Sequence, residues 1–209
     1  MMQITPTVKQ LIIINVLVFI GSQIPGIRDL SYDYFSLYSF ENPNFHFWQL
    51  LTHMFMHAPF PNLSHILLNM FGLYMFGSAL EHYWGGKKFF FFYISCGLGA
   101  AIVNNLVSYY NNDIMSVAVG ASGAIYGVIV AFAFMFPEAK LMMIFLPIPI
   151  KAKYFVPAIV AIDLFSGVTG TTIFGGGNIA HFAHVGGALV GFIMMWFWRK
   201  NSFNDRRWN

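Results

Sequence analysis

Two stretches of this sequence carry side chains suited to nucleophilic chemistry, and both lie in apolar surroundings. The first is Gly120-Ala121-Ser122-Gly123, which opens an apolar run that ends near Phe136. Glycine permits a sharp turn before the serine, and the first backbone N–H groups of a helix have no partner inside it. Those amides can stabilise a developing negative charge. Ser122 is therefore a candidate nucleophile, although small residues at a helix head are also common packing surfaces in membranes.

The second stretch contains His184, a candidate general base. Gly187 at i+3 and Gly191 at i+7 lie on the same helical face as this histidine. Gly123 begins a similar small-residue face beside Ser122, and two such faces let helices approach closely. That contact would bring the imidazole within reach of the serine hydroxyl, the pair that an activated nucleophile needs. The alternative role for the histidine is a structural hydrogen bond between helices.

Hydrogen-bond donors for a transition state are also present. His65 and Asn69 lie four residues apart and face the same way on a helix. Acyl transfer needs donors directed at the tetrahedral oxyanion. The alternative is a polar clamp between helices.

Two further polar residues, His181 and Asp163, are possible members of the site. His181 lies one turn before His184 but has no glycine at its i+3 position, so it ranks lower as the base. Asp163 lies in another apolar run, and its neighbours give no reason to direct it at His184. The sequence has no His-Glu-x-x-His motif, and His181-x-x-His184 alone is a weak metal signal. We expect neither a metal nor another cofactor.

The composition is that of a membrane protein. Only 9% of residues are charged and 57% are hydrophobic, whereas a soluble domain has about 25% charged residues. The small basic excess is a signal of topology and not of nucleic-acid binding. The single Cys96 excludes an intrachain disulfide. The composition sets no oligomeric state.

Six apolar segments predict an all-α membrane protein, one domain covering residues 1–209. A full span needs about 20 residues, and the segment that Ser122 opens is shorter. We therefore expect its helix to start below the membrane surface, beside a water-filled cavity. The predicted spans cover about 7–24, 62–81, 89–109, 121–136, 152–166 and 178–198.

The basic residues predict the orientation. Ten of the eleven Lys and Arg residues fall on one side of the six-span arrangement, and Arg28 alone is opposite. This bias predicts that both termini are cytoplasmic and that Ser122 lies near the outer face. The expected location is the plasma (inner) membrane.

Three connections have distinctive compositions. The first, 26–61, is crowded with aromatic residues, which favour the membrane interface, and we expect an ordered, partly embedded loop. The apolar segment 144–150 contains two prolines and should not be helical. The connection 167–177 is rich in glycine, and we expect a mobile segment able to act as a lid.

With Gly-Ala-Ser-Gly at 120–123 and Ala-His-x-x-Gly-x-x-x-Gly at 183–191, the chain resembles the rhomboid family of intramembrane serine proteases. The resemblance extends from about Trp48 to Gly191. Further matching motifs are Trp48-Gln49-Leu50-Leu51-Thr52-His53-Met54-Phe55-Met56-His57, His65-x-x-x-Asn69 and Gly77-x-x-x-Glu81-x-x-x-Gly85. Many family members have Trp-Arg where this chain has Trp48-Gln49.

The resemblance implies a role for each candidate. Ser122 would be the nucleophile and His184 the base, a dyad without a carboxylate. His65, Asn69 and the Ser122 amide would form the oxyanion hole. Tyr126 would stack on His184 and orient it.

The same resemblance implies supporting roles and a substrate class. Gly187 and Gly191 would permit the helix contact, while Glu81 and His57 would be structural. The expected architecture is a six-transmembrane-helix bundle, the minimal form of the family. Implied partners are the lipid bilayer and single-span membrane proteins, cut near the outer membrane boundary, often after a small residue. The alternatives are a non-catalytic rhomboid-like scaffold that binds transmembrane clients and, less well supported, a small-solute transporter.

Overall fold

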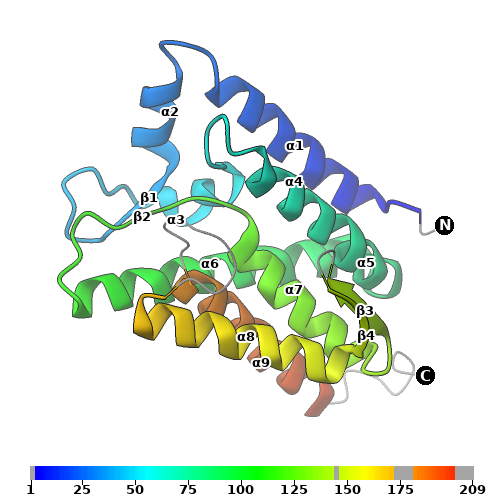
Figure 1. Cartoon of the computed structure of the whole chain (residues 1–209). Helices are drawn as coiled ribbons and strands as arrows, with labels where there is room; N and C mark the ends of the chain where they lie inside the picture. Colours follow the sequence, from blue (N-terminus) through cyan, green and yellow to red (C-terminus); the bar gives the residue numbers. More distant parts are fainter. Residues whose placement is uncertain (1–2, 144–145, 172–180, 201–209) are drawn as a thin grey trace.

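The computed structural model describes residues 3–143, 146–171 and 181–200, which are mostly helical (Figure 1). Side chains on the outer faces of several helices are apolar and exposed; Leu17 and Leu67, for example, are each 63% exposed. Many exposed apolar side chains of this kind fit contact with lipid. The prediction of a multi-pass helical membrane protein is confirmed. Among the described residues, four helices are long and apolar enough to cross a membrane: Leu63–Trp84, Gly86–Tyr110, Ala152–Thr169 and His181–Lys200.

The first helix, α1 (Pro6–Ser22), packs along a long helix made of three consecutive segments (Figure 1). Those segments are α4 (Leu63–Gly72), the π-helical η2 (Leu73–Gly77) and α5 (Ser78–Trp84).

The Glu81 side chain joins α5 to the start of α1. Its carboxylate accepts hydrogen bonds from the Thr7 amide at 2.9 Å, the Val8 amide at 2.8 Å and the Thr5 hydroxyl. Amides in the first turn of a helix have no partner inside it. The carboxylate therefore caps α1, and its negative charge suits the positive end of the helix dipole.

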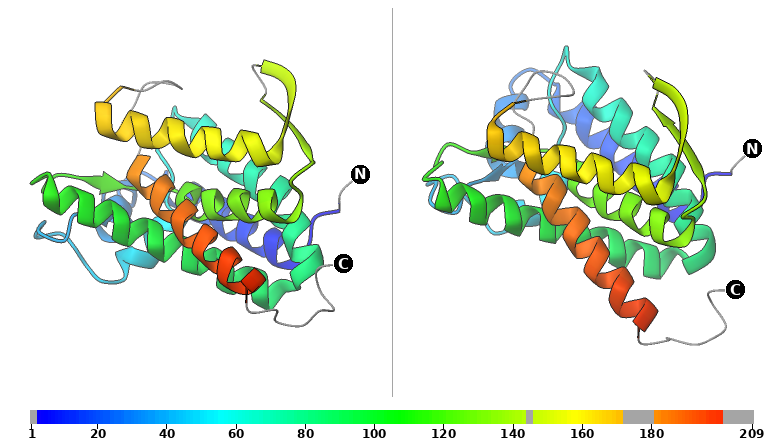
Figure 2. Two further views of the ribbon diagram at one scale, coloured as in Figure 1. Left: turned by 90° about the horizontal axis from the view of Figure 1, so that it is seen from below. Right: turned by 60° about the horizontal axis from the view of Figure 1, so that its bottom comes forward.

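The remaining long helices form the tightest part of the bundle. They are α6 (Gly86–Tyr110), α7 (Ser122–Met135), α8 (Ala152–Thr169) and α9 (His181–Lys200). Helix α7 packs against α6, α8 and α9, and α8 runs along the outside of α7 and α9 (Figure 2). The head of α7, where Ser122 lies, is therefore enclosed by neighbouring helices.

The first connection is ordered. It contains α2 (Arg28–Phe35), β1 (Leu37–Tyr38), α3 (Gln49–Thr52) and the 3-10 helix η1 (His53–Phe55). Strand β1 pairs antiparallel with β2 (Val117–Ala118), which lies just before α7. This pairing ties the first connection to the segment that carries the serine.

Gln49 holds the first connection together. Its side chain is fully buried; Oε1 accepts the Tyr38 amide at 3.3 Å, and Nε2 donates to the Asn44 carbonyl oxygen at 2.9 Å. The glutamine at this motif position therefore makes internal hydrogen bonds within the loop.

Two connections refine the predictions. The proline-containing segment is not helical, as predicted: β3 (Lys140–Met143) and β4 (Leu146–Lys151) form an antiparallel hairpin. The glycine-rich connection starts later than expected, because α8 continues past Gly167 to Thr169 and ends at Gly170, whose φ is +68°. Residues 172–177 of the predicted lid lie outside the described residues.

Candidate active site

The chain turns sharply just before α7. Gly120 has a φ of +121°, which a residue with a Cβ rarely adopts, and its amide donates to the His53 carbonyl oxygen at 2.9 Å. Ser122 is the first residue of α7, where the Ile125 amide donates to the Ala121 carbonyl oxygen at 3.0 Å. The amides of Ser122, Gly123 and Ala124 have no intrahelical acceptor, because the first N–H groups of a helix lack a partner within it. The serine thus lies beside backbone donors able to bind a negative charge.

The Ser122 hydroxyl lies 2.7 Å from Nε2 of His184, within hydrogen-bond distance. The Tyr126 ring stacks on this imidazole, with ring centroids 4.3 Å apart and planes 9° apart. Of the two histidines considered as a base, His184 contacts the serine, while His181 hydrogen-bonds Asp163 through Nδ1 at 2.6 Å.

Glycines allow α7 and α9 to approach closely enough for this contact. A Cβ on Gly187 would lie 1.8 Å from the Gly123 carbonyl oxygen. A Cβ on Gly191 would lie 2.7 Å from the Gly127 Cα. Helix α6 is close as well, since a Cβ on Gly123 would meet the Ala100 Cβ of α6 at 2.5 Å. The spacing between the helices therefore depends on residues without side chains.

Helix α4 places His65 and Asn69 near the serine. Nδ1 of His65 accepts the Ala58 amide at 3.0 Å, so in the neutral ring the proton is on Nε2. That nitrogen lies close to Gly120, since a Cβ there would be 2.8 Å from it. Nδ2 of Asn69 donates to the His65 carbonyl oxygen at 2.7 Å and has a second hydrogen to offer. Both side chains are potential donors.

The first connection contributes two buried histidines near this part of the site. The His57 ring lies 5.3 Å from the His65 ring, and its backbone carbonyl accepts the Tyr32 hydroxyl. Nδ1 of His53 donates to the Gln49 carbonyl oxygen at 2.9 Å. Burial lowers the pKa of both His53 and His57 to about 4, so both rings are neutral near pH 7.

Asp163 of α8, which no neighbouring residue in the sequence directs at His184, nevertheless contacts that histidine in the structure. One oxygen, Oδ1, lies 2.6 Å from His181 Nδ1 and 3.3 Å from His184 Nδ1, and the other accepts the Tyr126 hydroxyl. The only sequence signal for it was the carboxylate itself, since a charged residue inside an apolar span marks a functional candidate. Potential metal-ligand atoms of Asp163, His181 and His184 lie within 4.8 Å of one another, but these hydrogen bonds already account for the cluster.

These groups line a cavity of about 450 Å³ between α4–η2 and α8. Ser122 and His184 lie in its wall together with Asp163. The remaining wall is largely apolar and includes Leu68, Phe71, Phe76, Ile129, Ile159 and Ile162. The Ser122 side chain therefore faces a largely apolar space.

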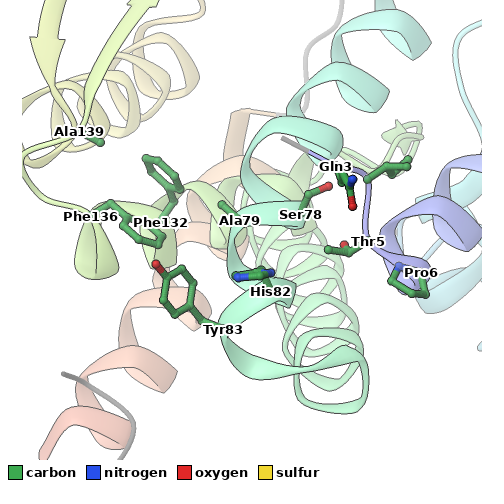
Figure 3. Close-up of a pocket in the computed structure, with 11 residues that line it drawn as sticks. Gln3, Thr5, Pro6, Ser78, Ala79, His82, Tyr83, Phe132, Phe136 and Ala139 are labelled. Atoms are coloured by element: carbon green, nitrogen blue, oxygen red, sulfur yellow. The ribbon is translucent and has the colours of Figure 1, made fainter. Parts of the chain in front are cut away.

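A second cavity, of about 660 Å³, also holds a serine and a histidine, four residues apart (Figure 3). It lies by the start of α1 and the far end of α7, away from Ser122. Ser78 Oγ has no hydrogen-bond partner within the described residues, so no base activates it. Ser78 and His82 therefore do not form a nucleophile–base pair.

The fold and the site define a helical membrane protein with a serine–histidine pair beside an internal cavity. Residues 44–201 match the family model of the Rhomboid domain. The chain belongs to the rhomboid family.

Named relatives include proteins of plants, animals and fungi. The chain is 31% identical over 195 residues to Rhomboid-like protein 11, chloroplastic, of Arabidopsis thaliana, an alignment covering 91% of this chain and 64% of the relative. It is 32% identical over 191 residues to human Presenilin-associated rhomboid-like protein, mitochondrial, an alignment that covers 88% of this chain and 46% of the relative. It is 30% identical over 148 residues to Rhomboid protein 1, mitochondrial, of Saccharomyces cerevisiae, an alignment that covers 68% of this chain and 40% of the relative. The chain thus spans roughly half of these relatives' lengths.

Proposed function

We propose that this protein is an intramembrane serine endopeptidase that cuts single-span membrane proteins near the outer membrane boundary. The observation that carries the proposal is the 2.7 Å contact between the Ser122 hydroxyl and His184 Nε2. Membership of the rhomboid family supports the same activity. The architecture proposed with it is one domain over residues 1–209 that crosses the membrane six times, with the first connection partly embedded.

The proposed reaction begins when the Ser122 oxygen attacks a substrate carbonyl carbon. Nε2 of His184 takes the hydroxyl proton, and the carbonyl oxygen becomes an oxyanion. Donors from His65, Asn69 and the Ser122 amide stabilise this charge. His184 then gives the proton to the leaving amide nitrogen, the C–N bond breaks, and an acyl-enzyme remains. Water from the outer side hydrolyses the ester, again with His184 as base.

The supporting residues position these groups. Tyr126 stacks on His184, and Gly120 and Gly123 let the head of α7 lie close to its neighbours. Gly187 and Gly191 allow α9 to do the same. No step requires a cofactor.

The test is cleavage of a model single-span substrate by the purified protein in detergent. We expect the wild-type protein to cut, and Ser122→Ala and His184→Ala to lose at least about a thousandfold in rate. His82→Ala, in the second cavity, is the control and should cut at the wild-type rate.

A serine-directed fluorophosphonate probe gives a second readout. It should label wild-type protein at Ser122 and fail to label Ser122→Ala. Equal cleavage by all variants would overturn the assignment of Ser122 and His184. If folded wild-type protein neither cuts several substrates nor binds the probe, the scaffold function becomes the better explanation.

A further inference from the structure

The proposed chemistry leaves the Asp163 carboxylate without a role. Asp163 lies on α8 and is buried, whereas Ser122 and His184 lie on α7 and α9. A buried carboxylate is costly unless it is hydrogen-bonded. Here the side chains of Tyr126, His181 and His184 all reach it. Because His184 is the proposed base, its contact with the carboxylate can affect which of its ring nitrogens carries the proton.

The protonation of His184 gives the carboxylate a function. To act as a base toward Ser122, Nε2 of His184 must be free of a proton. The neutral ring then carries its proton on Nδ1. Oδ1 of Asp163 lies 3.3 Å from that nitrogen and can accept its hydrogen bond. A carboxylate in this position favours the reactive tautomer and stabilises the imidazolium that forms during attack.

Two neighbours keep the carboxylate in this orientation. The Tyr126 hydroxyl donates to Oδ2, and His181 Nδ1 lies 2.6 Å from Oδ1. The 3.3 Å distance to His184 is long for a hydrogen bond, but such contacts in ligand-free sites often tighten when substrate binds.

A purely structural role is the competing explanation. Bonds from Tyr126 and His181 alone would hold α8 against α7 and α9 as a clamp. The clamp explanation predicts that loss of the charge changes stability or substrate binding. The orienting explanation predicts that it changes the rate of the chemical step.

We propose that Asp163 is a positioning residue that sets the reactive tautomer of His184, so that the site works as a serine–histidine–aspartate triad. The inference rests on the proposed protease function. Asp163 stays ionised throughout. The protons that move pass through Nε2 of His184: from Ser122 to the leaving nitrogen when the acyl-enzyme forms, and from water to the Ser122 oxygen when it is hydrolysed.

The first test compares Asp163→Asn with wild-type protein in cleavage of the same substrate. Asparagine keeps the shape and can still accept a hydrogen bond, but it lacks the charge. We expect kcat to fall about a hundredfold or more, with KM changed less than about threefold. Asp163→Glu should recover part of the rate. Leu164→Ala, on the exposed side of the same helix, is the control and should match wild type.

The second test measures the tautomer directly and needs no activity. Spectra of protein labelled with ¹⁵N-histidine report which ring nitrogen is protonated, and His184→Gln assigns the signal. We expect the His184 proton on Nδ1 in wild-type protein and a mixture of both tautomers in Asp163→Asn.

The outcomes separate the two proposals. Full cleavage by Ser122→Ala and His184→Ala would overturn the assignment of Ser122 and His184, and with it the proposed serine protease mechanism. If those variants are silent while Asp163→Asn retains the wild-type kcat, only the role of Asp163 is overturned. A His184 proton on Nε2 in wild-type protein would also overturn it, even where Asp163→Asn fails to fold.

Discussion

At the scale of single residues, the proposed oxyanion donors His65 and Asn69 are the clearest target. The Ala58 amide occupies His65 Nδ1, which leaves the Nε2 hydrogen for substrate, and Asn69 has one amide hydrogen to spare. We expect His65→Ala and Asn69→Ala each to lower kcat about 100- to 1,000-fold, because these donors act on charge that develops in the transition state. Steady-state cleavage rates across substrate concentration check this. A rise in KM with unchanged kcat would instead indicate a role in substrate binding.

Tyr126 makes two separate contacts, and substitution distinguishes them. Its ring stacks on His184 at 4.3 Å, and its hydroxyl donates to Asp163. We expect Tyr126→Phe, which keeps the ring, to retain more activity than Tyr126→Ala. Any activity that Tyr126→Phe loses relative to wild type measures the effect of the lost hydroxyl contact. Cleavage assays at matched thermal stability measure the difference. Equal losses would count against orientation by the ring.

The two buried loop histidines make stability depend on pH. Their pKa values fall from 6.5 to about 4 on folding, so below pH 6.5 the unfolded chain binds more protons than the native one. The stability that neutral burial contributes is complete above pH 6.5 and is lost as pH falls through 4, at most about 3 kcal/mol per histidine. Thermal unfolding in detergent at pH 7.5 and pH 4.5 measures the loss. His53→Asn should lose less stability than wild type between pH 7.5 and pH 4.5. An equal loss of stability would show that His53 does not contribute to the pH dependence.

The residues of the site differ in how far the sequence alone could predict them. The pairing of Ser122 with His184 followed from local signals, because glycines at helical spacing mark the faces that touch. The contact of Asp163 with His184 had no such signal. The contact depends on the orientation and position of α8 relative to α7 and α9. The spacing of residues along the chain does not determine either.

At the scale of helices, the contact between α7 and α9 is the most sensitive to substitution. A Cβ on Gly187 would lie 1.8 Å from the Gly123 carbonyl oxygen, backbone that cannot move without displacing Ser122. We expect Gly187→Ala to cost about 1–3 kcal/mol or more of stability and to abolish cleavage. Thermal unfolding and cleavage assays measure both effects. Gly21→Ala in α1, where a Cβ meets nothing within 4 Å, is the control; equal effects of both substitutions would show that the close approach is unimportant.

The boundaries of the helices were predictable to within a few residues, because apolar length and proline mark them. The π-helical segment Leu73–Gly77 and the continuation of α8 past Gly167 were not. The π-helical segment lies where helices pack closely, since a Cβ on Gly77 would lie 3.0 Å from Phe89 and Val8 atoms. Local composition favours a loop at the glycine-rich end of α8, but the helix continues until Gly170 adopts a left-handed conformation.

At the scale of the whole molecule, charge separates the two ends of the bundle. One end of the bundle holds the start of α1, the end of α9 and the β3–β4 hairpin. The other end holds β1, β2 and the head of α7 (Figure 1). The first end carries most of the basic residues of the described chain: Lys9, Lys87, Lys88, Lys140, Lys151, Lys153, Arg199 and Lys200. Cytoplasmic loops are enriched in Lys and Arg, so we propose that this end faces the cytoplasm and that the end with the head of α7 faces outward.

Two exposed methionines provide a matched pair for testing this orientation. Met115 lies before β2 and is 79% exposed, and Met142 lies on β3 and is 62% exposed. In a Cys96→Ala background, a membrane-impermeant maleimide added to intact cells should label Met115→Cys and not Met142→Cys. Permeabilised cells should label both, which shows that each cysteine is reactive. Labelling of Met142→Cys alone in intact cells would invert the topology and place Ser122 on the cytoplasmic side, where a cut near the outer membrane boundary is impossible.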